Sequence, residues 1–507
     1  MAMGGRVGSS DQHFGRLLIS SPQGHSGKTI VTVGLCDVFK RRGLSIQPFK
    51  KGPDYIDPSW LTVAAGRSCR NVDLFLIPED RLLPSFQQSC KGVNLAIVEG
   101  AMGLYDGLDS HGTTAEIARL LNIPILLVIN TTRMTSSIAA MVTGYQHFQK
   151  DIPIAGVILN YVSGTRHESK LRNAVDQYCG IPVVGSIPKD QDLRIIERHL
   201  GLIPSLESGE AESLVERIGR KLESRLDLDK ILLIARSSKA PQTPSLLPKK
   251  RKAKKSPLLL GERDRPPARK SLWLGEVRGT AGTKKVRIGI LRERAFNFYY
   301  PENFEALVNE GAELLFIDSF KDRLPKVDGL YIGGGFPEFF LKELEGNRSL
   351  RHDIAEAVQE GLPVYAECAG VMYLCRSISW QNRSYEMVGI IPAEAQLSEK
   401  PEGHGYVVAE VMIENPIFPV GLTIRGHEFH HSSLVNLNGL QFAYRILRGQ
   451  GMTGKRDGIV YKNLFASYIH LHALGTPEWA KGFVSLASKE KSGSRGIPNA
   501  KEGASLG

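Results

Sequence analysis

Short runs of apolar residues alternate with longer amphipathic stretches from Arg16 to about Ala235. Within each run the apolar residues follow one another directly, without the polar alternation of a strand that faces water on one side. Such runs are typical of parallel strands that are buried on both faces. Because they alternate with helical stretches, the first half of the chain is predicted to form a doubly wound α/β domain. The five clearest runs are residues 17–19, 95–98, 125–129, 154–159 and 182–184.

The same alternation stops near residue 236 and restarts at Val286. Further apolar runs are followed by a strand-rich stretch towards Ile469, which predicts a second doubly wound α/β domain. The segment between the two has too few apolar residues for a core, so we expect a mostly disordered linker there. The chain end, rich in Lys, Ser and Gly, is predicted to fray. The expected organisation is a first domain at 14–235, a linker at 236–285, a second domain at 286–487 and a flexible tail at 488–507.

The positive charge of the chain is concentrated in the predicted linker. The 507 residues have a formal net charge of +11, but 15 basic and 3 acidic residues lie between Arg236 and Lys285, so the remainder sums to −1. A basic folded surface would have suggested a nucleic-acid or membrane partner. We therefore predict no nucleic-acid partner, with a nuclear-localisation or nucleic-acid patch at 249–255 as the alternative interpretation.

Cysteine usage and the length of the apolar runs bear on the cellular compartment. The six cysteines include no C-x-x-C pair, which argues against a disulfide framework and against structural zinc. Residues 1–15 lack the apolar core of a signal peptide. The run 123–129 contains a proline and is far shorter than the about 20 residues that span a bilayer. We expect a cytoplasmic protein with no membrane partner.

A phosphate-binding loop is predicted where the first apolar run ends. Residues 17–20 lead into S-P-Q-G-H-S-G-K-T and then into a helical stretch at 30–39. Backbone N–H groups of such a strand–loop–helix unit bind phosphates, the lysine reaches the β- and γ-phosphates, and the threonine binds Mg²⁺. The strict sequence template has glycine where Pro22 stands. The predicted ATP-binding residues are Gly24, Gly27, Lys28 and Thr29.

Two acidic clusters follow the loop along the chain. The first is F-K-K-G-P-D-Y-I-D-P at 49–58, in which Asp54 and Asp57 accompany two lysines and suit a metal-phosphate and a polyanionic substrate. The second is V-E-G-A-M-G-L-Y-D-G at 98–107, in which Glu99 ends an apolar strand. Ligands of α/β domains bind at that end of a strand, and Mg²⁺ prefers carboxylate oxygens. Glu99 is therefore the predicted metal ligand, together with Thr29.

The second domain contains a candidate nucleophile. The apolar strand at 362–366 turns at Glu367-Cys368-Ala369-Gly370 into a helical run. A cysteine at such a turn is exposed, and the helix N-terminus favours its thiolate form. The nucleophile needs a base, and sequence spacing does not choose among the candidates. These candidates are His427, His430, His431, His470 and His472.

Taken together, these motifs resemble the cobyrinate a,c-diamide synthase family. That family joins an ATP-dependent domain, related to dethiobiotin synthetase, to a class I glutamine amidotransferase domain. Both acidic clusters carry the resemblance, whereas cobyric acid synthases are not expected to have the G-P-D-Y-I-D run. Trp60 departs from the family, in which histidine is common at that place. Further matching segments are R-S-C-R-N-V-D at 67–73, R-H-L-G-L at 198–202, A-F-N-F-Y-Y-P-E-N at 295–303 and I-G-G-G-F-P-E at 332–338.

The resemblance implies a role for each matching residue. Cys368 is the nucleophile and His470 its base, while His472 stands where other class I amidotransferases have the glutamate of a triad. Gly334 and Gly335 belong to the loop that supplies backbone N–H groups to the oxyanion. The residues implied in substrate binding and carboxylate phosphorylation are Asp54, Tyr55, Asp57 and Asp106.

The implied activity is ATP- and glutamine-dependent amidation of the a and c acetates of a tetrapyrrole, with Mg²⁺ as cofactor and cobyrinate as the first-choice substrate. Three alternatives stay open: amidation of sirohaem or Ni-sirohydrochlorin, a P-loop switch ATPase, and a non-catalytic scaffold tethered through 249–255. The oligomeric state is open, with a homodimer as one option.

Overall fold

The N-terminal domain is built on a seven-stranded sheet in which all strands are parallel. Its order is β3-β2-β4-β1-β5-β6-β7. This computed structural model describes residues 14–238, without 109, 110, 194, 196, 199 and 200, and residues 285–493. The strands are β1 (Gly15–Ser20), β2 (Ile46–Lys51), β3 (Arg70–Val72), β4 (Leu95–Glu99), β5 (Ile125–Asn130), β6 (Ile154–Val162) and β7 (Val183–Pro188).

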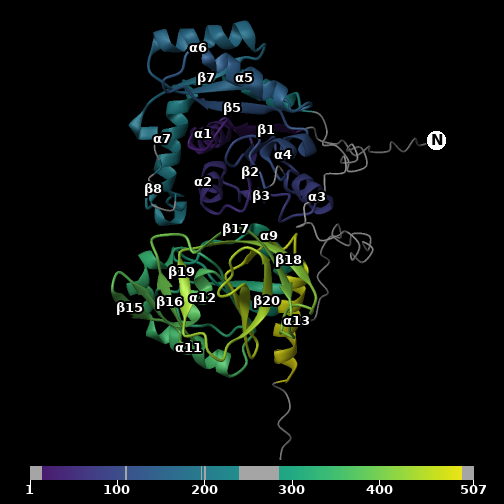
Figure 1. Cartoon of the computed structure of the whole chain (residues 1–507), viewed down its shortest axis with the longest axis vertical. Coiled ribbons are helices and arrows are strands. Elements are labelled where there is room, and N and C mark those ends of the chain that lie inside the picture. Colours follow the sequence, from purple (N-terminus) through teal and green to yellow (C-terminus); the bar gives the residue numbers. More distant parts are fainter. Residues whose placement is uncertain are drawn as a thin grey trace, which may run out of the picture.

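Helices cover both faces of this sheet (Figure 1). Strand β4 shows why its apolar run is unbroken: Leu95 and Ile97 join one buried core, whereas Ala96 and Val98 join the core on the other face. The doubly wound fold predicted for this half is confirmed. The helices are α1 (Lys28–Arg41), α2 (Ile56–Ala65), α3 (Glu79–Ser89), α4 (Thr114–Leu121), α5 (Ser137–Phe148), α6 (Thr165–Tyr178), α7 (Ala211–Glu223) and α8 (Leu228–Arg236), with a small hairpin β8 (Glu197–Arg198) and β9 (Gly201–Leu202).

Strand β2 was not among the expected strands. Its sequence I-Q-P-F-K-K carries a proline and two lysines, which hide the apolar pattern, yet all six residues are buried. It lies between β3 and β4, so Lys50 ends beside Glu99 at the carboxyl edge of the sheet. Lys50, a buried lysine near the end of this strand, is therefore placed at the ligand-binding edge of the sheet rather than in the apolar core.

The C-terminal domain has a ten-stranded mixed sheet, β11-β10-β12-β13-β22-β21-β20-β17-β18-β23, and a four-stranded sheet, β15-β14-β16-β19. The first five strands of the larger sheet are parallel, and the others pair antiparallel. The α/β class is confirmed, and the strand-rich end of the sequence supplies the antiparallel part.

The strands are β10 (Val286–Leu291), β11 (Ala312–Ile317), β12 (Gly329–Ile332), β13 (Val364–Glu367), β14 (Cys375–Trp380), β15 (Arg383–Glu386), β16 (Ile391–Leu397), β17 (Gly403–Val411), β18 (Thr423–His430), β19 (Ser432–Val435), β20 (Gln441–Arg448), β21 (Arg456–Tyr461), β22 (Leu464–Ser467) and β23 (His470–Leu471). The helices are α9 (Pro301–Asn309), α10 (Leu341–Gly346), α11 (Arg348–Gln359), α12 (Ala369–Leu374) and α13 (Glu478–Gly493).

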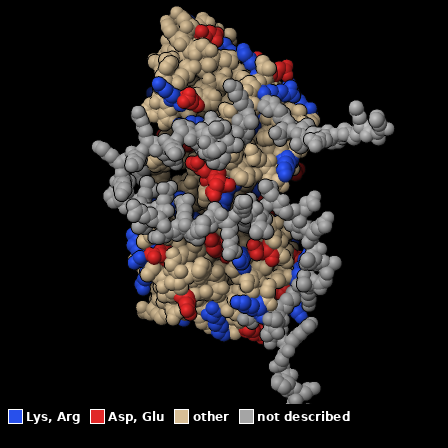
Figure 2. Space-filling model, turned by 90° about the vertical axis from the view of Figure 1, so that its right-hand side faces the viewer, with Lys and Arg blue, Asp and Glu red and all other residues tan. Residues whose placement is uncertain are grey.

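The expected linker and tail lie mainly outside the described residues. Helix α8 ends at Arg236, next to the predicted boundary, and α13 continues six residues past 487 to Gly493. Figure 2 shows acidic and basic side chains interspersed on the visible face of both domains, rather than one basic stripe. Among the described residues, none of the helices combines the length and apolarity needed for a membrane span.

The two domains are stacked along the long axis of the molecule, with the edge strand β3 of the first sheet on the side of the second domain and β7 on the far side (Figure 1). Arg70 of β3 donates to Glu302 of α9 at 3.3 Å and also pairs with Glu305. Tyr406 of β17 donates its hydroxyl to Asp73, and its ring packs on Phe75. Charged and aromatic contacts therefore fix the orientation of the two domains.

Candidate functional site

The predicted phosphate loop lies between β1 and α1 and is tightly constrained. Gly27 has φ +91°, and a Cβ there would stand 2.2 Å from Asn160 Nδ2, so only glycine fits. Gly24 has open space around it. Lys28 Nζ donates to Ser21 Oγ and to the Met102 carbonyl, both at 2.8 Å. The lysine ammonium thus lies beside the loop, where phosphates of a nucleotide would replace its present partners.

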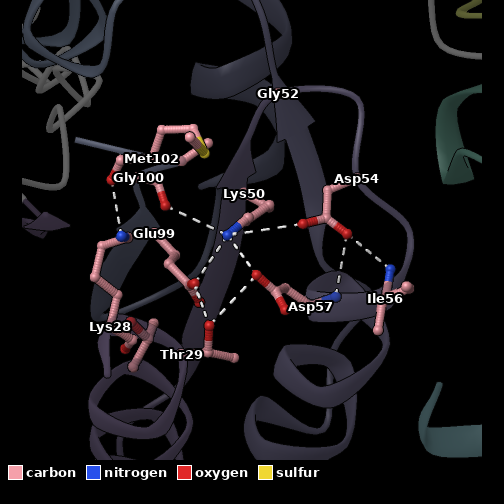
Figure 3. Close-up of polar contacts among 12 residues, drawn as sticks. Lys28, Thr29, Lys50, Gly52, Asp54, Ile56, Asp57, Glu99, Gly100 and Met102 are labelled. Atoms are coloured by element: carbon pink, nitrogen blue, oxygen red, sulfur yellow. Dashed lines mark hydrogen bonds and ion pairs between the residues drawn. The ribbon is translucent and has the colours of Figure 1, made fainter. Parts of the chain in front are cut away.

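A second lysine is the centre of the acidic cluster. Lys50 Nζ lies 2.5 Å from Asp57 Oδ2, 2.8 Å from Glu99 Oε1 and 3.8 Å from Asp54 Oδ2. Figure 3 shows this ammonium between the three carboxylates. The geometry brings together residues from β2, β4 and the start of α2, as the two sequence clusters predicted. Lys50 itself was not among the predicted site residues.

Burial and mutual charge shift the pKa values of these groups. Burial raises the pKa of Glu99, and Lys50 offsets this only in part. Burial also opposes ionisation of Asp57, but the contact with Lys50 outweighs it and lowers the pKa of that carboxyl. Desolvation, followed by the charge of Asp57, raises the pKa of Asp54 to about 7. Burial, followed by the charge of Lys50, lowers the pKa of Lys28 to about 8.

The oxygen atoms around Thr29 fit a Mg²⁺ ion. Thr29 Oγ1 donates to Glu99 Oε1 at 2.7 Å and approaches Asp57 Oδ2 at 3.4 Å. Glu99 Oε2 is buried without a hydrogen-bond partner among the described residues. A buried, unpaired carboxylate oxygen beside a hydroxyl is the hard donor set that Mg²⁺ prefers, with phosphate oxygens and water completing its shell.

The other two predicted aspartates have additional structural bonds. Asp54 Oδ1 accepts from the backbone N–H groups of Ile56 and Asp57 and so caps the start of α2. Asp106 Oδ2 accepts from Gly103 N at 2.8 Å and fixes the loop after β4. Its charge also acts on Lys28, so it lies on the phosphate side of the cluster.

A small pocket opens beside the phosphate loop. Asn160 donates to the Ser26 carbonyl at 2.9 Å, which ties this wall of the pocket to the loop. The lining residues are Gly27, Ile30, Val31, Asn160, Tyr161, Ile187, Pro188, Asp190 and Leu193.

Cys368 stands on a sharp turn between β13 and α12. Its φ of +49° and ψ of −106° lie outside the regions preferred by non-glycine residues. Its backbone N–H donates to Ser467 on the neighbouring strand at 2.9 Å, which helps to hold this strained conformation. Strained turns of this kind present a nucleophile at the end of a parallel strand. The predicted strand–turn–helix context of Cys368 is therefore present. The expected exposure is wrong: Cys368 is only 4% exposed, because neighbouring core residues pack around the turn.

The geometry selects one base from the five candidate histidines. Gly334 lies against both Cys368 and His470: a Cβ on it would stand 3.4 Å from Cys368 Cβ and 2.4 Å from His470 Cε1. Burial opposes the charged imidazolium of His470, but Cys368, followed by Glu367, raises its pKa to about 9. The imidazole and the thiol therefore form an interacting pair.

The other four histidines have different surroundings. His427 stacks on His470 with ring centroids 4.8 Å apart, and burial, followed by the charge of His470, lowers its pKa well below the ordinary value. His430 and His431 bond backbone carbonyls of Ser432 and Ser398. His472 faces Glu302 at 3.6 Å.

The glycine loop after β12 is crowded against the nucleophile. A Cβ on Gly335 would stand 2.1 Å from the Ala295 carbonyl, and Gly333 N already donates to Tyr299. Gly334 thus lies next to Cys368, whereas Gly335 packs on Ala295 and lines the same pocket as Cys368. A pocket opens here, lined by Gly335, Phe336, Glu338, Cys368, Met372, Leu397, Phe429, His430 and His431.

Tyr55 connects the two halves of the site. It follows Asp54 in the first domain, yet its ring stacks on Phe298 of the second domain with centroids 5.0 Å apart. The same ring lies 4.7 Å from Tyr300, 5.6 Å from His427 and 5.3 Å from His470. The phosphate half and the cysteine half of the molecule are therefore in contact through one side chain.

Sequence reasoning missed two charged residues of the site, Lys50 and Glu367. Lys50 is the penultimate residue of β2 and lies inside the cluster at 49–58, whereas Glu367 ends β13 directly before Cys368. A charged residue at the carboxyl end of a buried strand is the signal that identified Glu99, and applied consistently it finds both.

Comparison with known proteins supports this organisation. Residues 17–203 match the family model described as the CobQ/CobB/MinD/ParA nucleotide binding domain. Residues 287–478 match the CobB/CobQ-like glutamine amidotransferase domain.

The chain is similar over nearly its whole length to several curated proteins. A cobyrinate a,c-diamide synthase of Magnetococcus marinus is 43% identical, covering 92% of this chain and 95% of the relative. Its counterpart in Methanosarcina acetivorans is 38% identical, with 94% and 95% covered. That of Archaeoglobus fulgidus is 37% identical, with 94% and 98% covered. With both domains matched and the relatives covered almost completely, the chain belongs to the cobyrinate a,c-diamide synthase family of glutamine-hydrolysing ligases.

Proposed function

We propose that the chain amidates the a and c acetate carboxylates of cobyrinate, with ATP as the activating co-substrate and glutamine as the nitrogen source. The observation that carries this proposal is the contact of Tyr55 with His470. It joins a phosphate loop with an acidic cluster to a cysteine–histidine pair, and a coupled amidoligase needs both. The names of the relatives support cobyrinate as the substrate.

In the glutaminase half, Cys368 Sγ attacks the carboxamide carbon of glutamine. The backbone N–H groups at Gly334 and Gly335 stabilise the oxyanion that forms. The proton of the Cys368 thiol passes to His470, which then donates it to the departing ammonia. Burial opposes the charged imidazolium, but Cys368, followed by Glu367, raises the pKa of His470 to about 9 in the free site. Water then hydrolyses the thioester, with His470 as the base.

In the ligase half, Lys28 holds the β- and γ-phosphates of ATP. Mg²⁺, held by Thr29 and Glu99, would neutralise charge on the phosphates when bound. Lys50 and Asp57 order the edge where the substrate carboxylate approaches. The carboxylate oxygen attacks the γ-phosphorus, ADP leaves, and ammonia then displaces phosphate from the acyl phosphate. Positioning and charge neutralisation supply most of the catalysis in such transfers.

The deciding experiment offers the purified protein cobyrinate, sirohaem and Ni-sirohydrochlorin in separate reactions with ATP, Mg²⁺ and glutamine. We expect two successive mass changes on cobyrinate only, each replacing OH by NH₂. Conversion of a sirohydrochlorin-type ring instead would overturn the substrate. ATP hydrolysis without glutaminase activity would favour the switch ATPase, and neither activity would favour the scaffold.

The acyl phosphate has its own test. With cobyrinate carboxylates labelled by a heavy oxygen isotope, we expect one labelled oxygen in inorganic phosphate for each amide formed. Unlabelled phosphate would contradict the intermediate without affecting the substrate assignment.

A further inference from the structure

The catalytic histidine has a carboxylate neighbour that does not come from the expected place. In the class I amidotransferase pattern the acid of the triad stands two residues after the histidine, a position that His472 occupies here. His472 faces away from this role: its Nε2 lies 3.6 Å from Glu302, and its Nδ1 accepts from Leu474 N at 3.2 Å.

Glu367, the residue before the nucleophile, faces His470 instead. Its Oε2 lies 3.8 Å from His470 Nδ1, and both side chains are 1% exposed. That nitrogen has no hydrogen-bond partner among the described residues. The opposite edge of the ring, Cε1 and Nε2, faces Gly334, which also touches Cys368. The imidazole therefore lies between the carboxylate on one side and the nucleophile on the other.

Three donors hold the Glu367 carboxylate in this position. Oε1 accepts from Leu471 N and from the Tyr365 hydroxyl, each at 3.0 Å, and Oε2 accepts from the Tyr331 hydroxyl at 2.9 Å. Leu471 is the residue after His470, so the carboxylate is tied to the strand that carries the histidine. An acceptor fixed in this way sets the orientation and tautomer of the ring.

We propose that Glu367 is the positioning carboxylate of the glutaminase site, holding His470 with its Nδ1 proton towards Oε2 and its Nε2 towards Cys368. The separation of 3.8 Å exceeds a hydrogen bond, and contacts of this kind shorten when substrate binds. This inference rests on the proposed glutaminase roles of Cys368 and His470. It places the nucleophile and its supporting acid next to each other in the chain.

The test is the pH profile of kcat for glutamine hydrolysis in Glu367→Gln. Against the effect of burial, Cys368 and then Glu367 raise the pKa of His470, so neutralisation of Glu367 removes one of the two raising causes and lowers the pKa at which the imidazolium loses its proton. We expect the basic limb of the profile to move to lower pH and kcat to fall about 100-fold, in the range of general acid–base effects. Glu367→Asp is expected to recover part of both. The other titratable groups facing His470 are Cys368, Tyr55 and His427.

Two controls separate this role from a structural one. Tyr365→Phe removes one hydrogen bond from the same buried carboxylate and keeps its charge, so its basic limb is expected to stay in place. Ammonium chloride supplies ammonia directly, so amidation with it does not require glutamine hydrolysis. We expect this activity to persist in Glu367→Gln, and its persistence would show that the ligase domain of the variant is folded.

Each outcome decides between the alternatives. Wild-type kcat and an unmoved basic limb in Glu367→Gln, with inactive Cys368→Ser, would overturn the role of Glu367 and leave the glutaminase intact. An active Cys368→Ser would instead overturn the glutaminase assignment itself. Where Glu367→Gln loses both activities, Glu367→Asp decides: a basic limb displaced from that of the wild type supports the role of the carboxylate, and an unmoved basic limb contradicts it.

Discussion

The ring of Tyr55 lies 5.3 Å from the ring of His470, although the two residues belong to different domains. Asp54, which precedes Tyr55, interacts with Lys50 of the phosphate-side cluster. Tyr55 thus contacts His470 in space and is the neighbour of Asp54 in the chain, so one residue lies between the proposed glutaminase base and the acidic cluster. In the proposed mechanism, ammonia is released beside Cys368 and His470, and His470 is the member of this pair that contacts the first domain through Tyr55.

This contact predicts that Tyr55 couples the two reactions. In Tyr55→Ala we expect more glutamine to be hydrolysed per amide formed, because the aromatic packing that closes the interface is lost, a packing worth about 0.5–1.5 kcal/mol per ring pair. Tyr55→Phe keeps the ring and is expected to stay coupled. Glutamate and amide measured in the same reaction give the ratio.

A second interface aromatic serves as the matched control for that prediction. Phe75 packs on Tyr406, so Phe75→Ala loosens the interface elsewhere. An equal rise of the ratio in both variants would contradict a specific role of Tyr55.

Substitution of the nucleophile separates the two nitrogen sources. Cys368→Ser is expected to lower glutamine-dependent amidation at least about 100-fold, since the hydroxyl is a much weaker nucleophile than the thiolate. Ammonium-dependent amidation is expected to remain, because the ligase half is untouched. Cys375, buried in the core with its thiol on the Val371 carbonyl, is the control cysteine: Cys375→Ser should keep glutamine-dependent activity wherever the protein folds.

Removal of Lys50 is expected to destabilise the first domain and to stop amidation with either nitrogen source. Its side chain is 4% exposed and pairs with Asp57 and Glu99, and breaking a buried pair costs about 3–5 kcal/mol. Denaturant unfolding of Lys50→Met measures this cost. Lys51, buried beside it and without an ion pair to a described carboxylate, provides the comparison: a similar loss in Lys51→Met would assign the effect to burial alone.

The metal assignment predicts a changed Mg²⁺ requirement in Glu99→Gln. With one carboxylate charge removed, the Mg²⁺ concentration for half-maximal amidation is expected to rise about tenfold or more. Glutaminase activity without ATP serves as the internal control and should not change. An unaltered Mg²⁺ dependence would remove Glu99 from the set of ligands.

Asp54 is expected to make the protein less stable as the pH rises, which is opposite to the usual effect of a carboxyl group. Desolvation raises its folded-state pKa from 3.8 to about 7, so between these values the folded state binds a proton that the unfolded state has lost. The contribution of Asp54 to stability is therefore lost as pH rises through this window. Asp54→Asn keeps the oxygen that caps α2 and avoids the buried charge, so we expect it to gain stability relative to wild type at pH 8 and little at pH 4. Thermal unfolding at both pH values checks this, and a gain that does not vary with pH would contradict it.

The sequence by itself determined the two α/β domains, the phosphate loop and the nucleophile turn. These features depend on residues that are neighbours in the chain. Unbroken apolar runs indicate strands that are buried on both faces, and Gly27 and Cys368 each lie in a short turn between a strand and a helix. Glu99 was also predictable, because a parallel strand that ends in a carboxylate places it at the ligand-binding edge.

Only the tertiary structure decided which distant groups meet. Sequence spacing left five histidines as candidates and only the family resemblance pointed to His470, whereas the packing places this histidine against Gly334, which also contacts Cys368. Lys50 was hidden in a strand whose proline and lysines mask its pattern, and its role appears only when β2 lies beside β4. The partner of His470 is Glu367 on a different strand, and the contact of Tyr55 with that histidine exists only because two separate domains dock. Sequence spacing contains no information on such pairs, since their distances depend on how strands and domains pack.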